Sequence, residues 1–188
     1  MKKTIPCLLL FVISHTGVSG LNINIGNSFS SAVKVHFSEY NDNPLLSQTG
    51  SSLSVRNLLG FTDWFYIRGG ITVFAFKPSI TFGALNYSGF SGLAAETGAE
   101  FSFGGRQLKM SRFKFTGAIW GSYSFAQYSS ASLLFSYPGI GISAGITLYF
   151  TNSLPFKFGF SLPFELYFRR DLSTAISAGA EMTIQLVW

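Results

Sequence analysis

The stretch FKFGFSLPFELYF, residues 156–168, decides the fold. Every second residue in it is apolar, and nearly all the residues between are small, polar or charged. A helix, with about 3.6 residues per turn, would scatter the apolar side chains around its circumference, whereas a strand places alternate residues on opposite faces. The stretch therefore predicts a strand with one apolar face. That face would carry Phe156, Phe158, Phe160, Leu162, Phe164, Leu166 and Phe168.

The same alternation recurs along the chain and predicts eight strands. In the final segment, for example, apolar residues occupy every second position from Ile176 to Trp188. The expected strands cover residues 31–38, 64–76, 80–87, 93–103, 113–125, 140–150, 156–168 and 176–188. An even number of strands that follow one another with turn signals between them is typical of an antiparallel up-and-down barrel.

The segments between these strands differ in length. Two of them, Gly104–Gln107 and Thr151–Pro155, are short and rich in turn residues. The polar stretch Asn41–Asp63 is expected to form a long loop, which would be the most exposed feature of the barrel.

At 188 residues the chain is expected to form one domain behind an export signal. Lys2 and Lys3 precede an apolar run, and small residues follow it up to Gly20, which is the pattern of a cleaved secretory signal peptide. Residues 1–20 are therefore expected to be removed and residues 21–188 to form the barrel. Loss of Cys7 with this segment would leave no cysteine, so no disulfide is expected.

Composition and volume decide which face of the barrel points inward. Only 11% of the residues are charged, while 47% are hydrophobic and 17% aromatic, yet no window approaches the about 18 to 20 apolar residues of a membrane-spanning helix. The interior of an eight-stranded barrel is just wide enough to be filled by side chains. The phenylalanine-rich face would overfill it and must point outward. The sequence thus predicts an all-β transmembrane antiparallel up-and-down barrel.

The opposite face is expected to line the lumen and to hold a charged network. Buried charges are tolerated when they are paired and hydrogen-bonded, and cations and anions occur there in nearly equal number. His36, the single histidine outside residues 1–20, shares this face. The predicted network comprises Lys34, His36, Arg68, Glu96, Glu100, Arg112, Lys114, Lys157, Glu165 and Glu181.

The chain ends on an aromatic residue, with apolar residues at alternate positions before it: Met182, Ile184, Leu186 and Trp188. Together with the export signal and the eight strands, this ending resembles the bacterial outer-membrane barrels of the OmpA, OmpX and OmpW type. The resemblance covers residues 21–188 as architecture and picks out no single family. It implies the outer membrane of a diderm bacterium as the location. It also implies that the last strand is the signal read by the barrel-assembly machinery, with periplasmic chaperones and outer-membrane lipids as further partners.

Catalysis is not expected. The sequence offers no metal-ligand cluster, phosphate loop or cysteine nucleophile, so no cofactor is predicted. His36, Ser38 and Glu39 lie close together, but this is weak evidence for a hydrolase in a serine-rich chain, and a lipid-modifying enzyme is the least favoured function. After removal of Lys2 and Lys3 the chain has 11 basic and 8 acidic residues with no basic run, so nucleic acid is not an expected partner.

Two functions of different class are left open. The first is a structural or surface-interaction barrel that acts through extracellular loops and their ligands. The second is an OmpW-like channel for small hydrophobic solutes with a lateral opening. Proline weakens strand pairing, so Pro138 and Pro163 are the candidate positions for that opening. A general porin is not expected, because open aqueous channels have about 16 or more strands.

Overall fold

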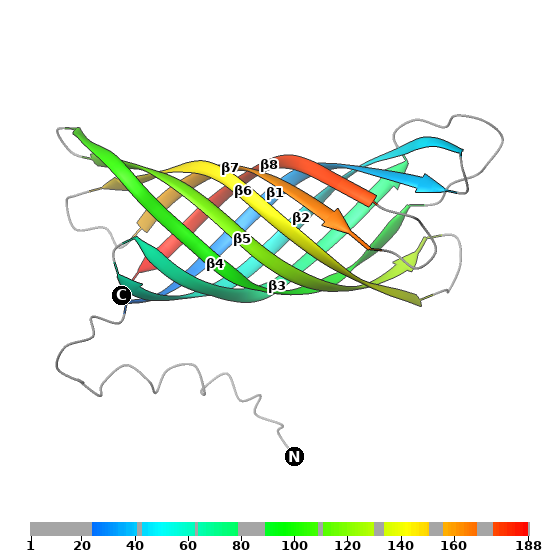
Figure 1. Ribbon diagram of the computed structural model, residues 1–188, viewed down its shortest axis with the longest axis horizontal. Helices are drawn as coiled ribbons and strands as arrows, with labels where there is room; N and C mark the ends of the chain where they lie inside the picture. The colour runs from blue at the N-terminus through cyan, green and yellow to red at the C-terminus, as the bar shows by residue number, and fades with distance from the viewer. Residues whose placement is uncertain are drawn as a thin grey trace, which may run out of the picture.

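The chain folds into one closed barrel of eight antiparallel strands in sequence order, as predicted (Figure 1). The computed structural model describes residues 24–40, 43–62, 64–78, 89–108, 111–129, 134–150, 156–168 and 175–187. Among these residues, no helix is long and apolar enough to cross a membrane. The strands are β1 (Asn24–Tyr40), β2 (Asn43–Thr62), β3 (Phe65–Pro78), β4 (Phe90–Leu108), β5 (Ser111–Tyr128), β6 (Leu134–Phe150), β7 (Phe156–Tyr167) and β8 (Ala175–Val187).

The last strand closes the barrel on the first, with pairs that run from Gly26↔Val187 to Ser38↔Ala175. Paired residues followed once around the barrel from Gly26 arrive at His36, so the register advances by ten residues. Such a stagger requires strands tilted by about 35–45° from the barrel axis, and Figure 1 shows them crossing the long axis obliquely. We call the end with Asn24 and Val187 the terminal end, and the opposite end, where β1 leads into β2, the loop end.

The largest correction to the sequence prediction concerns β2. The expected long loop over Asn41–Asp63 is wrong, because Asn43–Thr62 forms a 20-residue strand that pairs with both β1 and β3. Its outer face mixes Leu53 and Val55 with polar residues such as Ser51, so its apolar alternation is weak. The strand expected at residues 80–87 lies outside the described residues.

The turn expected at Gly104–Gln107 is also wrong. Pairing of β4 with β5 continues to Leu108↔Ser111, and the register shifts between Phe103 and Arg106. Gly104 has a φ of 67°, a left-handed conformation that glycine adopts without steric cost. The glycines therefore form a β-bulge inside the strand rather than a connection between strands.

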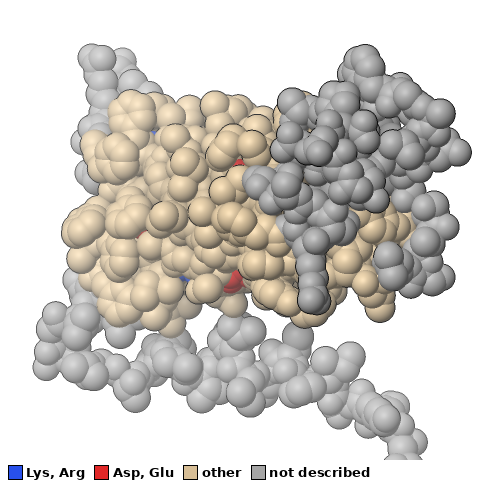
Figure 2. Space-filling view, turned by 45° about the vertical axis from the view of Figure 1, so that its right-hand side comes forward, with Lys and Arg blue, Asp and Glu red and all other residues tan. Residues whose placement is uncertain are grey.

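The two faces of the barrel differ sharply in polarity. Large apolar side chains stand on the outside, with exposed fractions such as 45% for Phe158, 55% for Ile142 and 58% for Leu162. Among the charged residues whose side chains the structure describes, Lys77 alone is exposed on the surface. The outer surface in Figure 2 is accordingly almost free of charged atoms. The other charged side chains that the structure describes point into the lumen or are half-buried.

Candidate functional site: a filled lumen

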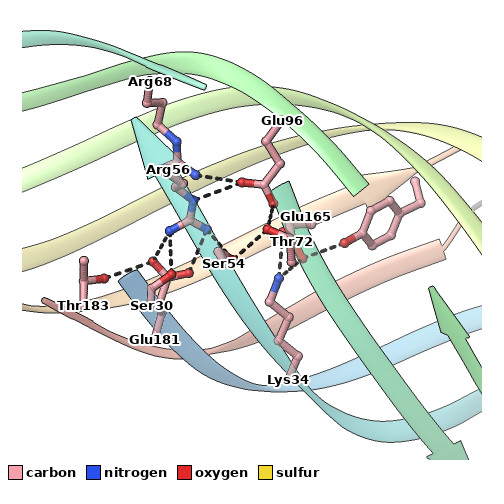
Figure 3. Close-up of polar contacts among 11 residues, drawn as sticks. Ser30, Lys34, Ser54, Arg56, Arg68, Thr72, Glu96, Glu165, Glu181 and Thr183 are labelled. Carbon is pink, nitrogen blue, oxygen red and sulfur yellow. Dashed lines mark hydrogen bonds and ion pairs between the residues drawn. The ribbon is translucent and has the colours of Figure 1, made fainter. Parts of the chain in front are cut away.

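Arg56 of β2 stands at the centre of the lumen network (Figure 3). Its guanidinium donates to both carboxylate oxygens of Glu181, with Nη1–Oε1 at 2.9 Å and Nη2–Oε2 at 3.1 Å. Its Nε donates to Glu96 Oε2 at 3.0 Å, and the hydroxyls of Ser30 and Ser54 accept further bonds. One arginine thus bridges two carboxylates from opposite parts of the wall. Sequence reasoning missed Arg56, because it fell in the expected loop.

Glu96 of β4 connects Arg56 to a second arginine. Arg68 Nη2 lies 3.3 Å from Glu96 Oε2, and the hydroxyl of Thr72 donates to Oε1 of the same carboxylate. The Arg68 guanidinium also lies over the Trp120 ring, 4.4 Å from its centroid, which is a favourable cation–π geometry. Two arginines and two carboxylates therefore form one connected, buried group.

Lys34 and Glu165 form a separate buried pair nearer the loop end. Lys34 Nζ donates to both oxygens of Glu165, at 2.8 and 2.7 Å. The hydroxyl of Tyr167 donates to Glu165 Oε2 at 2.7 Å. The pair joins β1 to β7 over the intervening β8 and contributes to filling the lumen.

The other charged residues predicted for the network lie toward the terminal end. Glu100 accepts a hydrogen bond from Gln185 Nε2 at 2.9 Å. Lys157 Nζ lies 5.8 Å from the centroid of the Tyr66 ring, and Lys114 is half-buried on the lumen face of β5. Arg112 pairs through its backbone with Gln107 and Tyr149, and its side chain lies outside the described residues.

Aromatic side chains fill the lumen on the loop-end side of the network. The rings of Phe76 and Phe90 stack at 5.0 Å, and those of Tyr137 and Tyr167 meet edge to face at 5.3 Å. His36 is fully buried among them, with ring centroids 5.2 to 5.6 Å from Phe76, Phe90 and Tyr167. We call this group the aromatic cap: Phe74, Phe76, Phe90, Tyr128, Phe135, Tyr137 and Tyr167 around His36.

A catalytic role for His36 as a base would depend on which groups surround its imidazole. The imidazole packs against three aromatic rings, and the side chains of Ser38 and Glu39 lie outside the described residues. In the part of the chain that the structure describes, no group of three or more His, Cys, Asp or Glu side chains could hold a metal ion.

Two cavities in the described part of the lumen are of the size of a few water molecules. One of about 30 Å³ lies beside Arg56, Arg68 and Glu100. Another of about 10 Å³ lies between the Lys34–Glu165 pair and the cap. Because one water needs about 10–15 Å³ on this measure, these cavities have room for a few waters and not for a solute.

The two prolines proposed for a lateral opening lie in strands that keep their register. Pro138 pairs with Tyr123 within an unbroken β5–β6 ladder. In the described β7–β8 ladder no pair forms at Leu162 or Pro163, since proline has no backbone N–H, but the register is the same on both sides.

A groove on the outer wall begins two residues beyond Pro138. Its volume is about 570 Å³ and its lining consists of apolar side chains and glycine, including Ile140, Ile142 and Phe164. Trp120 contributes to the lining of the groove, and its indole lies under the Arg68 guanidinium in the lumen and packs on Gly141, where an added Cβ would overlap it. Glycine at position 141 thus gives the indole room to pack against the inside of the wall.

The residues predicted as an assembly signal lie on the outer face of β8. Met182 and Ile184 are exposed and Leu186 is half-buried. Trp188 lies outside the described residues.

These observations define the class: a closed eight-stranded barrel with an apolar exterior and a lumen filled by ion pairs and aromatic rings. No family model matches the sequence, and no curated protein matches it either. The fold is similar to that of Neisserial surface protein A, with a TM-score of 0.54, 9% identity, and coverage of 86% of this chain and 96% of that one.

Two further solved structures are more distant in fold. The attachment invasion locus protein Ail of Yersinia pestis has a TM-score of 0.47 at 14% identity, covering 86% of this chain and 98% of that one. The outer membrane protease OmpT from Escherichia coli has a TM-score of 0.37 at 6% identity, covering 88% and 96%. At these identities the likeness concerns the fold and not the function.

Proposed function

We propose that this protein is an integral outer-membrane barrel that acts as a membrane-anchored scaffold and presents its loop end at the cell surface. The observation that carries the proposal is the contrast between the two faces. The outside is apolar, with exposed side chains such as Phe158 and Leu162, and the inside is filled by the Arg56 network and the aromatic cap. A barrel that is blocked inside and apolar outside has its functional surface at its ends.

Strand length supports a role at an end of the barrel. A tilted strand of about 9–11 residues crosses the hydrocarbon core, and the strands here have 12 to 20 residues. The barrel therefore extends beyond the membrane. We assign no catalytic role, and the buried setting of His36 among rings supports this assignment.

Cysteine labelling of intact cells tests the proposal. Ser129 at the loop end and Thr62 at the terminal end are both exposed, so Ser129→Cys and Thr62→Cys form a matched pair in a chain whose Cys7 is replaced by Ser. A membrane-impermeant thiol reagent should label Cys at position 129 in intact cells, and Cys at position 62 after the outer membrane is opened. Recovery of the protein in the soluble fraction, or equal labelling of both positions, would contradict the proposal.

The outer groove supports a second candidate, the passage of small hydrophobic solutes through the wall. The groove is apolar, lies beside Pro138 and has Trp120, a residue that also packs in the lumen, in its lining. Under this hypothesis, vesicles containing the protein should take up a small apolar probe, and Trp120→Ala should accelerate the uptake. Uptake by the wild type no faster than by empty vesicles would leave the scaffold function alone.

A further inference from the structure

Two amide side chains lie next to each other on the apolar outer face. Asn27 of β1 and Asn57 of β2 lie directly opposite each other in the ladder. Both occupy outer positions, where Asn57 is exposed and Asn27 is half-buried. Apolar residues flank them along both strands: Ile25 and Phe29 on β1, and Val55 and Leu59 on β2.

Neither amide has a hydrogen-bonding side-chain partner within the described residues. In hydrocarbon such groups are unfavourable, because no water is present to bond them. One bond to nearby backbone can largely satisfy a serine or threonine hydroxyl, whereas an asparagine amide can make such a bond and still has further donor and acceptor sites to satisfy. Polar side chains at membrane depth are therefore expected to mark a contact with another group that can hydrogen-bond.

The wall beside the amides permits a close approach. Asn57 pairs with Gly69 of β3, an outward position whose added Cβ would meet no atom nearer than 3.7 Å. In transmembrane helices, small residues and hydrogen-bonding side chains at the contact bring segments together, and the same physical reasoning applies to two barrel walls. The surface formed by Asn27, Asn57 and Gly69 has both features, and we call it the amide face.

We propose that the amide face binds the amide face of a second copy of this chain. The inference rests on the membrane location proposed above. Copies inserted in the same direction are related by a two-fold axis parallel to the barrel axis, which sets Asn27 and Asn57 of each copy at the same depth. An amide is both donor and acceptor, so the pair is complementary to itself. A lipid acyl chain at this depth has no group that could bond either amide.

Crosslinking in native membranes tests the dimer. Val55→Cys places a thiol on the outer face beside Asn57 and leaves both amides intact, in a chain whose Cys7 is replaced by Ser. Ile142→Cys is the matched control, with a similar exposed fraction on β6, across the barrel from β2. A short thiol crosslinker should yield a covalent dimer from Cys at position 55 and none from Cys at position 142. Crosslinking at both positions or at neither would overturn the proposal.

A second variant separates the dimer from membrane insertion. Asn27→Leu with Asn57→Leu should abolish the crosslink at position 55, while the barrel keeps the shift in gel mobility on heating that marks a folded barrel. Gln127→Leu, which removes an exposed amide on β5, across the barrel from β1, should leave the crosslink unchanged. A persistent dimer in the double leucine variant would overturn the amide face. Absence of the wild type from the membrane fraction would instead contradict the proposed function, and the dimer with it.

Discussion

Replacement of Arg56 by methionine should be one of the most destabilising single changes in the lumen. Methionine keeps much of the volume but removes every hydrogen bond that Arg56 donates to Glu181, Glu96, Ser30 and Ser54. Glu96 would still have Arg68 and the hydroxyl of Thr72. Glu181 would keep one contact in this group, the hydroxyl of Thr183 at 3.3 Å. The lost hydrogen bonds and ion pair therefore affect mainly the Glu181 carboxylate, whose side chain is only 9% exposed.

The magnitude follows from the buried charge left behind. Removal of one partner of a buried ion pair costs about 3–5 kcal/mol, because the other charge stays desolvated. We expect Arg56→Met to lower the free energy of unfolding by about 3–5 kcal/mol. The double variant Arg56→Met with Glu181→Gln removes the orphaned charge as well. It should recover about 0.5–3 kcal/mol, the usual coupling between contacting residues.

Urea unfolding in lipid vesicles, followed by the heat-dependent shift in gel mobility, measures these changes. Lys77→Met is the control, since Lys77 is exposed on the outer face of β3 and its removal should change stability by less than about 0.5 kcal/mol. If Arg56→Met unfolded within about 1 kcal/mol of the wild type, or if the double variant were less stable than the single one, the network would not hold the lumen as described.

Three further changes test other parts of the barrel by the same unfolding assay. Gly141→Ala should destabilise the protein by about 1–3 kcal/mol, because the added methyl overlaps the Trp120 indole. The control Gly121→Ala, whose added methyl meets no atom nearer than 4.0 Å, should change stability by less than about 0.5 kcal/mol. Equal effects of the two changes would contradict the packing of the indole on Gly141. Phe90→Ala should cost about 3–5 kcal/mol, because it empties the centre of the cap; a neutral result would refute the packing. Ile142→Arg should cost about 2–4 kcal/mol if this face meets lipid, and a neutral result would argue for water there.

The fold could be predicted because the strands of the second half keep one face almost entirely apolar, with Gln127 and Ser136 as polar interruptions near the loop end. In β7 and β8 the alternation from Phe156 and from Ile176 fixes both the strand and the direction of its side chains. β2 could not be recognised in this way, since its outer face carries Ser51 and Asn57 among apolar residues. For the same reason Arg56 was not predicted to face the lumen. The alternation of Leu53 and Val55 with Ser52 and Ser54 was the sequence signal that could have indicated the strand.

The aromatic cap escaped prediction for a different reason. In β3 both faces are apolar near the loop end, where Val73 and Ala75 point outward while Phe74 and Phe76 point inward. Alternation therefore cannot assign the faces there. The volume argument also failed locally: a narrow lumen excludes rings along its whole length but accepts one layer of them where other lumen positions are glycine or alanine, such as Gly139 and Ala94.

The central claim is that the lumen of this membrane barrel is filled. Ion conductance of the purified protein in a planar lipid bilayer tests it most directly, with insertion verified in the same preparation by the heat-dependent gel shift. Ion pairs around Arg56 and the rings of the cap leave cavities for a few waters, so we predict no stepwise conductance. Stable, uniform conductance steps from the folded wild type would contradict the account.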